Sequence, residues 1–455
     1  MRVRQPNSSE RVRQHGHDIA VAAALTLWTG LVAPLAAQTS LQVPLQFDFL
    51  NPGAKSLAMG GAFTGVADDA TATLANPAGL IQLSQREISV EGRFTATETA
   101  FLEGGRLSGQ TFNQGIDTVS GPVFGTSHGR HTGPTFISVV APFRSNRWVV
   151  AAHRHELVRV DQQFFSTGVF QQDAGSFTST RDRPQQGDRR LSVTSYGGSV
   201  AFAPRTGLAV GAGLTVYRFS IDSVFTRFDT QGFLGPATLT KEIGRSSQVG
   251  DDVGVSPSVG LFVGAGGRTR AGLLYRHGPS FKFTTRDGLD PERDVTFRVP
   301  HTLAFGLSHR PRPSIILAAE VTRITYARLE DEFVTDQARG DGRAADFKID
   351  SGTEVHIGGQ YLALQWRWAP KFRLGAWYDP NHSVRFRPTA MPTTSGDRLF
   401  DQRLRTALSK GDDRVHGTGG IGLSLSPRVE WNAGVDVASG GYILSTSIIL
   451  RAGNR

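Results

Sequence analysis

The chain has 455 residues, a formal net charge of +9, 53 glycines, 28 phenylalanines and no cysteine. The lack of cysteine excludes a lipoprotein anchored through an acylated cysteine, disulfide scaffolds and cysteine-based metal sites. The basic residues are spread along the chain without a cluster or a recognisable nucleic-acid fold, so we expect no nucleic-acid partner. Most of them are arginines, whose guanidinium fits phosphate. In an envelope protein lipid phosphates are favoured over DNA as partners, and a compositional bias without function is favoured over both.

Residues 1–37 have the pattern of a secretory signal peptide. Four arginines precede an apolar stretch over 19–35, and small residues lead to a cleavage site near Ala37. The alternative is a single membrane-spanning anchor, although Gly30 and Pro34 interrupt a span that is barely long enough. Export without disulfides is compatible with a bacterial envelope protein.

Residues 53–80 form a stretch that is rich in small residues and has no sustained period of two. Asp68 is placed to cap a helix over 69–74, and Asn76 to cap a turn that begins at Pro77, where a missing N–H costs nothing. Gly60, Gly61 and Gly65 permit backbone geometry and close packing that other residues resist. The stretch predicts either a compact group of short helices packed inside another structure or a mobile lead-in.

From residue 87 onward the chain is predicted to form fourteen strands separated by two kinds of connection. The expected strands are 87–97, 133–141, 148–165, 191–203, 208–226, 251–263, 270–285, 294–308, 315–329, 353–366, 372–386, 413–425, 429–438 and 441–451.

Short, turn-rich connections alternate with longer polar ones. The short ones are expected at 142–147, 204–207, 264–269, 310–314, 370 and 427–428; the long ones are expected at 98–132, 166–190, 227–250, 286–293, 330–352 and 387–412. Only the short connection at 439–440 breaks this alternation. Short turns at one end and long loops at the other, with an even number of strands, are typical of an outer-membrane barrel. We therefore predict an all-β fold, a closed antiparallel transmembrane barrel of fourteen strands over 87–455, with 98–132, 166–190, 227–250 and 387–412 outside the cell.

The expected strand faces agree with this prediction. In 429–438, Val429, Trp431 and Val437 alternate with Glu430 and Asp436, which predicts a lipid-facing outside and a polar lumen. Four tryptophans lie near the expected short turns, where an interfacial aromatic girdle belongs: Trp148, Trp366, Trp368 and Trp431. A barrel of fourteen strands is too wide for its wall side chains alone to fill. We therefore expect residues 38–86 to form a small helical plug, or hatch, in the lumen.

The sequence resembles FadL-type outer-membrane transport proteins, which import long-chain fatty acids and, in related members, aromatic hydrocarbons. The resemblance rests on the glycine-rich lead, on 67–70 (Ala-Asp-Asp-Ala) and 76–78 (Asn-Pro-Ala), on 298–303 (Arg-Val-Pro-His-Thr-Leu) and on 412–414 (Asp-Asp-Arg). It implies a fourteen-stranded barrel with an N-terminal hatch. It also suggests where hatch or binding residues lie: Gly60, Gly61, Asp68, Asp69, Asn76, Pro77 and Ala78. The glycine-rich lead alone also resembles the barrel subunit of type IX secretion systems.

The sequence patterns that are typical of enzymes are weak evidence for a catalytic or metal site in this chain. The segment 417–422 fits the dinucleotide pattern G-x-G-x-x-G, but it opens no helix, so small strand residues explain it. His153 and His155 share a strand face and would make half a metal site without a nearby third ligand. Asp251-Asp252 and Asp412-Asp413 are expected to be solvated loop acids. We expect no enzyme activity, no cofactor and no metal site.

Two functions remain. The first is a passive outer-membrane channel for hydrophobic small molecules, above all long-chain fatty acids, acting as a monomer among outer-membrane lipids. The alternative is an outer-membrane barrel that serves as a structural or docking component of a secretion system. Ligand that co-purifies with the protein would favour the first function, and a stable protein partner would favour the second.

Overall fold

The computed structural model describes residues 49–143, 147–174, 179–287, 291–330, 332, 346–392, 395–409 and 412–452. The predicted signal peptide (1–37) and the first part of the predicted hatch (38–48) lie outside these residues. Within the part described, no helix combines the length and the apolar character needed to cross a membrane.

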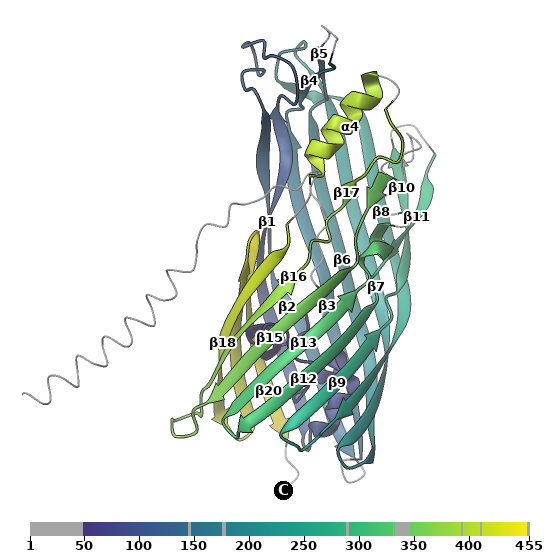
Figure 1. Ribbon diagram of the computed structural model, residues 1–455. Coiled ribbons are helices and arrows are strands. Elements are labelled where there is room, and N and C mark those ends of the chain that lie inside the picture. Colours follow the sequence, from purple (N-terminus) through teal and green to yellow (C-terminus); the bar gives the residue numbers. More distant parts are fainter. Residues whose placement is uncertain are drawn as a thin grey trace, which may run out of the picture. The chain divides into compact units, whose positions relative to one another are not determined.

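Fourteen strands form a closed antiparallel ring, as predicted (Figure 1). The ring closes because β20 pairs with β1 and β8 pairs with β9. In ring order its strands are β1 (Arg86–Gly105), β2 (Pro122–Phe143), β3 (Trp148–Ser166), β6 (Gln185–Arg205), β7 (Leu208–Thr230), β8 (Ala237–Val263), β9 (Thr269–Arg276), β12 (Thr302–Arg312), β13 (Ile315–Ile324), β15 (Gly352–Leu362), β16 (Lys371–Asp379), β18 (Arg414–Ser426), β19 (Val429–Ala438) and β20 (Gly441–Ala452).

The strand faces follow the predicted alternation. In β12, Leu303 and Phe305 point outward and are 48% and 47% exposed, whereas Ala304 between them is 2% exposed. In β19, Val437 is 50% exposed and Asp436 only 3%. Apolar side chains on the outside and small or polar ones inside match a wall that faces lipid.

Two predicted strands are broken. The strand expected over 270–285 is β9 followed by β10 (Ser280–Asp287), and the one expected over 294–308 is β11 (Arg293–Arg298) followed by β12. The breaks fall at 277–279 and 299–301, which contain Pro279 and Pro300. Proline lacks the N–H that a ladder requires, so the continuous strand pattern was misleading at both places.

The wall is much taller on one side than on the other. On one side the ring strands have 19 to 27 residues each, namely β1, β2, β3, β6, β7 and β8. On the other side they have 9 to 13, namely β13, β15, β16, β18, β19 and β20. Strands therefore continue into three of the predicted loops, 98–132, 166–190 and 227–250. Above the membrane both faces of a strand meet water, so polar residues do not distinguish a strand from a loop there.

Smaller elements lie at the end with the long connections. The predicted strands 315–329, 353–366 and 372–386 end earlier, at Ile324, Leu362 and Asp379. The predicted loop 387–412 contains a helix. The smaller elements at this end are β4 (Phe170–Gln172), β5 (Ser179–Arg181), η2 (Tyr326–Leu329), β14 (Phe347–Lys348), β17 (Arg385–Phe386) and α4 (Ser395–Ala407).

Candidate functional site

Residues 49–85, called here the luminal segment, run through the inside of the barrel near the short turns (Figure 1, purple). They form α2 (Ala54–Ala58), α3 (Ala72–Ala75) and η1 (Pro77–Gln82). Helix α2 packs on β16, β18, β19 and β20, while η1 packs on β3, β6, β7, β8 and β9. These two groups of strands lie on different arcs of the ring, so the segment bridges the lumen. Most of its side chains are buried.

Glycines of the wall allow the backbone of the luminal segment to touch the strands. A Cβ on Gly306 of β12 would lie 2.5 Å from Gly65 N, and a Cβ on Gly375 of β16 would lie 2.4 Å from Gly60 N. Any side chain at these positions would push the segment away from the wall. The small residues of the luminal face are therefore matched to the segment they enclose.

Gly60 and Gly61 lie where the segment passes β15 and β16. Both have positive φ, 64° and 76°, a conformation that favours glycine. The carbonyl oxygen of Gly60 is 2.8 Å from His356 Nδ1 of β15. A Cβ on Gly61 would lie 3.0 Å from the same nitrogen. Both glycines thus meet the wall directly.

The predicted cap at Asn76 is present. Asn76 Oδ1 accepts a hydrogen bond from Ala78 N at 3.1 Å, and Pro77 occupies the first position of η1. The Asn76 amide also donates to the carbonyls of Thr64 (3.2 Å) and Leu261 (3.1 Å). Asn76 is fully buried and therefore fastens η1 both to the rest of the luminal segment and to β8.

The predicted cap at Asp68 is wrong. Asp68 instead pairs with Lys55 and, at 3.3 Å, with Arg310 at the end of β12. Burial alone would raise the pKa of Asp68, but these cations outweigh it and hold the pKa below its usual value. Asp69 Oδ1 accepts the Thr71 N–H at 2.9 Å, and α3 starts only at Ala72; burial raises the pKa of Asp69. The ion pair with Lys55 thus takes the place of the predicted hydrogen bonds between Asp68 and the start of a helix.

Sequence reasoning missed Glu320 of β13. Its carboxylate accepts hydrogen bonds from Phe63 N (2.8 Å), Thr64 N (2.7 Å) and Thr64 Oγ1 (3.0 Å). Glu320 is 3% exposed. An acidic residue at a luminal position of an otherwise mostly apolar strand is the signal that would have singled it out.

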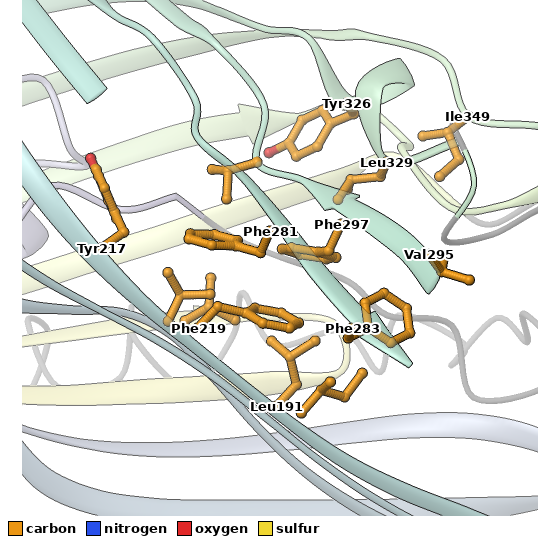
Figure 2. Packing of buried hydrophobic residues seen from close by; sticks show 14 of the residues in the cluster. Leu191, Tyr217, Phe219, Phe281, Phe283, Val295, Phe297, Tyr326, Leu329 and Ile349 are labelled. Atoms are coloured by element: carbon orange, nitrogen blue, oxygen red, sulfur yellow. The ribbon is translucent and has the colours of Figure 1, made fainter. Parts of the chain in front are cut away.

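Further along the lumen, toward the long connections, side chains pack into an apolar cluster (Figure 2). The rings of Phe281 and Phe297 stack on Phe219, with centroids 5.1 and 5.2 Å away. The apolar cluster consists of Val158, Leu191, Val193, Tyr217, Phe219, Ile221, Phe281, Phe283, Val295, Phe297, Val299, Ile324, Tyr326, Leu329 and Ile349. Barrels that conduct polar solutes have polar interiors, so this cluster gives the lumen a different chemistry.

Arg276 lies at the end of β9, five residues before Phe281 and across β8 from the strand that carries Tyr217. Its Nη2 donates to the carbonyl of Leu74 in the luminal segment at 2.7 Å. Its Nε is buried and makes no hydrogen bond, and among the residues described it forms no ion pair with a carboxylate. The site therefore has a cation with donor capacity to spare beside an apolar surface.

The wall has a break between β2 and β3. These strands pair only from Phe143↔Trp148 to Phe136↔His155, whereas β3 remains paired with β6 as far as Ser166. Beyond the last pair, side chains replace the ladder: His131 Nε2 lies 3.0 Å from Glu156 Oε1. A hollow of about 530 Å³ opens beside this break. It is lined by His128, Arg130, Asp161, Gln162, Gln163, Asp188 and Arg190.

The other motifs do not form sites. No group of three or more potential metal ligands occurs in the described part of the chain. His153 Nδ1 lies 3.1 Å from Thr73 Oγ1 of the luminal segment, so this histidine contacts the segment. The dinucleotide-like pattern 417–422 lies within strand β18. Asp252 Oδ2 accepts the Lys282 N–H at 2.7 Å, where the β8–β9 ladder is interrupted.

No protein-family model and no curated protein sequence matches the chain. Solved structures do match over most of its length. A FadL homologue from Pseudomonas aeruginosa superposes with a TM-score of 0.58 at 13% identity, covering 89% of this chain and 99% of that one. The Pseudomonas putida toluene transporter TodX gives 0.53 at 15% identity over 90% and 100%. The Ralstonia pickettii toluene transporter TbuX gives 0.52 at 16% identity over 89% and 100%.

The chain thus has the FadL-type fold that its sequence resembles, a closed barrel with a helical segment in the lumen. A closed fourteen-stranded barrel with an apolar outer band is the architecture of bacterial outer-membrane proteins.

Proposed function

We propose that this protein is a passive outer-membrane channel for hydrophobic small molecules and that long-chain fatty acids are its substrates. The observation that carries the proposal is the apolar cluster inside a closed barrel. Hydrophobic and aromatic side chains lining an interior, with a few polar groups, are typical of sites for apolar ligands. The solved structures with this fold include two toluene transporters, which supports a hydrophobic ligand.

An acyl chain suits the apolar cluster. Each buried CH₂ group contributes about 0.8 kcal/mol, so a long tail binds through apolar contact alone. Phe219, Phe281 and Phe297 are packed on one another in the structure and would have to part to admit a tail. The tail would replace ring–ring contacts with ring–methylene contacts, so that little apolar surface would be exposed during entry.

Arg276 favours a fatty acid over a neutral hydrocarbon. A carboxylate would fill the free donor capacity of its guanidinium while the tail lies among the phenylalanines. Hydrogen bonds between charged groups contribute about 1.5–3 kcal/mol, which corresponds to about 10- to 150-fold in affinity. A neutral aromatic molecule would gain nothing from this arginine.

The luminal segment is proposed to act as the plug. Gly60, Gly61, Asn76, Pro77 and Ala78 hold it against the wall, and Asp68 and Asp69 fix its central turn, so these residues would control its release. With the axis of the barrel obstructed, the unpaired stretch between β2 and β3 is the proposed way out. A molecule leaving there would pass through the wall sideways.

Binding to the purified full chain tests the substrate. Titration calorimetry with oleate should show affinity falling about 10- to 150-fold in Arg276→Met, with toluene binding unchanged. The matched control is Arg323→Met, which removes an exposed arginine from the outer face of β13. Equal loss of both ligands would refute the carboxylate role but not the channel. Absence of binding by the unaltered protein, together with unchanged oleate and toluene uptake in cells lacking it, would refute the channel.

A further inference from the structure

The short-turn end of the barrel carries a ring of arginines. Each of the six short turns, at 142–147, 204–207, 264–268, 310–314, 363–370 and 427–428, contains at least one arginine and no aspartate or glutamate. One exposed arginine from each turn defines what we call the rim arginines: Arg147, Arg205, Arg268, Arg312, Arg367 and Arg428. They belong to six successive hairpins and therefore surround the barrel.

The rim arginines are available for binding. Among the residues described, none of them forms an ion pair with a carboxylate. The one side-chain hydrogen bond is from Arg147 Nη2 to the Pro204 carbonyl, at 3.2 Å. At the seventh junction of the same rim, Arg451 is instead bound to Glu87 and Glu430, at 2.8 and 3.1 Å. Arg451 is thus neutralised by the protein, whereas the rim arginines are not.

The long-connection end has a different character. Acids occur there, and some arginines pair with them, as in Arg403–Asp182 at 2.8 Å and Arg106–Asp117. Others, such as Arg227 and Arg245, are exposed and form no ion pair among the residues described. The short turns differ from this end of the barrel because they contain no aspartate or glutamate.

Tryptophans accompany the rim arginines. Trp366 and Trp368 are 58% and 48% exposed on either side of Arg367, whose guanidinium carbon lies 4.8 Å from the Trp368 ring centroid. Trp148 begins β3 beside Arg147, and Trp431 lies three residues after Arg428. Tryptophan concentrates at the level of lipid head groups, so the rim arginines lie at that level too.

We propose that the rim arginines bind the phosphate groups of anionic phospholipids in the inner leaflet of the outer membrane, forming an annular lipid shell. Short turns of such barrels face the periplasm, where this leaflet lies. Guanidinium groups match phosphate geometry, and juxtamembrane arginines are attracted to anionic lipids. The distribution of the rim arginines over six of the seven junctions fits a shell of lipids, because a single protein partner bound at one side would need a one-sided patch.

The tryptophans provide the measurement. The full chain is reconstituted in phosphatidylcholine vesicles with brominated phosphatidylglycerol or brominated phosphatidylcholine, and quenching of tryptophan fluorescence gives their relative binding constant. Four tryptophans lie at the rim, while Trp377 is luminal and 3% exposed. We expect phosphatidylglycerol to bind about fivefold more tightly than phosphatidylcholine at a lipid site that engages one arginine. This preference should weaken as salt is added.

Two variants with equal loss of charge decide the outcome. The rim variant replaces Arg205, Arg268, Arg312, Arg367 and Arg428 with Gln. The control variant replaces five exposed arginines nearer the long connections, Arg130, Arg159, Arg218, Arg227 and Arg245, with Gln. The preference should disappear in the rim variant and persist in the control, with both variants showing unaltered far-ultraviolet circular dichroism.

Three results would overturn the proposal. These are no preference in the unaltered protein, equal loss in both variants, or a periplasmic protein that binds the rim without any lipid preference. Should the rim variant fail to fold, the five single substitutions are measured instead, and unchanged preference in all five would count against the proposal. Replacing the same five residues with Lys should retain part of the preference, because the charge remains.

Discussion

The carboxylate of Glu320 in β13 accepts both the N–H and the hydroxyl of Thr64 in the luminal segment, at 2.7 and 3.0 Å. A buried wall residue thereby holds a segment that lies more than 250 positions earlier in the sequence. Glu320 contributes its side chain to this contact, whereas the luminal segment contributes mostly backbone N–H groups. The wall side chain can therefore be changed without altering the segment itself.

The first prediction concerns this contact. Glu320→Gln replaces a charged acceptor with a neutral one, and each hydrogen bond to a charged group contributes about 1.5–3 kcal/mol. The luminal segment should loosen while the ladder around the ring stays intact. Conductance across a planar bilayer should rise in the variant, with no change in thermal unfolding of the barrel.

Glu354→Gln is the matched control for this prediction. Glu354 is also buried in the lumen, but it accepts from Tyr326 Oη at 2.9 Å and lies 3.3 Å from His356 Nε2. Among the residues described, it makes no direct hydrogen bond to the luminal segment. Equal conductance in both variants would mean that Glu320 does not hold the segment.

The second prediction concerns Asn76. Asn76→Ala removes three buried hydrogen bonds, so the local cost exceeds the ~1 kcal/mol of an ordinary helix cap. Asn76→Asp keeps the acceptor for Ala78 N but loses the donors to Thr64 and Leu261. We expect both variants to fold and hydrogen exchange over 64–83 to accelerate in both. Unchanged exchange in Asn76→Ala would contradict the prediction.

The third prediction concerns close packing. Gly375→Ala places a Cβ 2.4 Å from Gly60 N, so the luminal segment must move. Gly417→Ala lies on the neighbouring strand and meets no atom within 4 Å. Conductance and protease sensitivity of the segment should increase only in the first variant. Comparable behaviour of the two would show that the glycine contact does not position the segment.

The fourth prediction concerns the break between β2 and β3. Pro134 has no N–H, and it lies in β2 just beyond the last pair with β3. Pro134→Val restores a donor and should let the ladder extend, since β3 already continues beyond this point. We expect slower amide exchange over 128–134 together with slower fatty-acid uptake. If amide exchange slows but fatty-acid uptake stays normal, the substrate does not leave through this break.

The sequence by itself determined the wall. Fourteen strands, their alternating faces and the end that carries the short turns follow from period-two patterns, because lipid outside and a lumen inside impose opposite chemistry on successive residues. The cap at Asn76 was equally local, since its hydrogen bond spans two residues. The strand lengths beyond the membrane were missed, because water on both faces removes the alternation.

Only the tertiary structure decided which distant residues meet. Asp68 pairs with Lys55 and Arg310 although its neighbours predict a helix cap, because a charged partner brought close by the fold outweighs a local backbone group. The apolar cluster combines residues from β3, β6, β7, β10, β11, β13 and η2, whose patterns along the chain do not reveal their register across the lumen. Likewise, Arg276 resembles many other arginines in sequence, and it differs because the barrel places it beside the apolar cluster and, among the described residues, in no ion pair with a carboxylate.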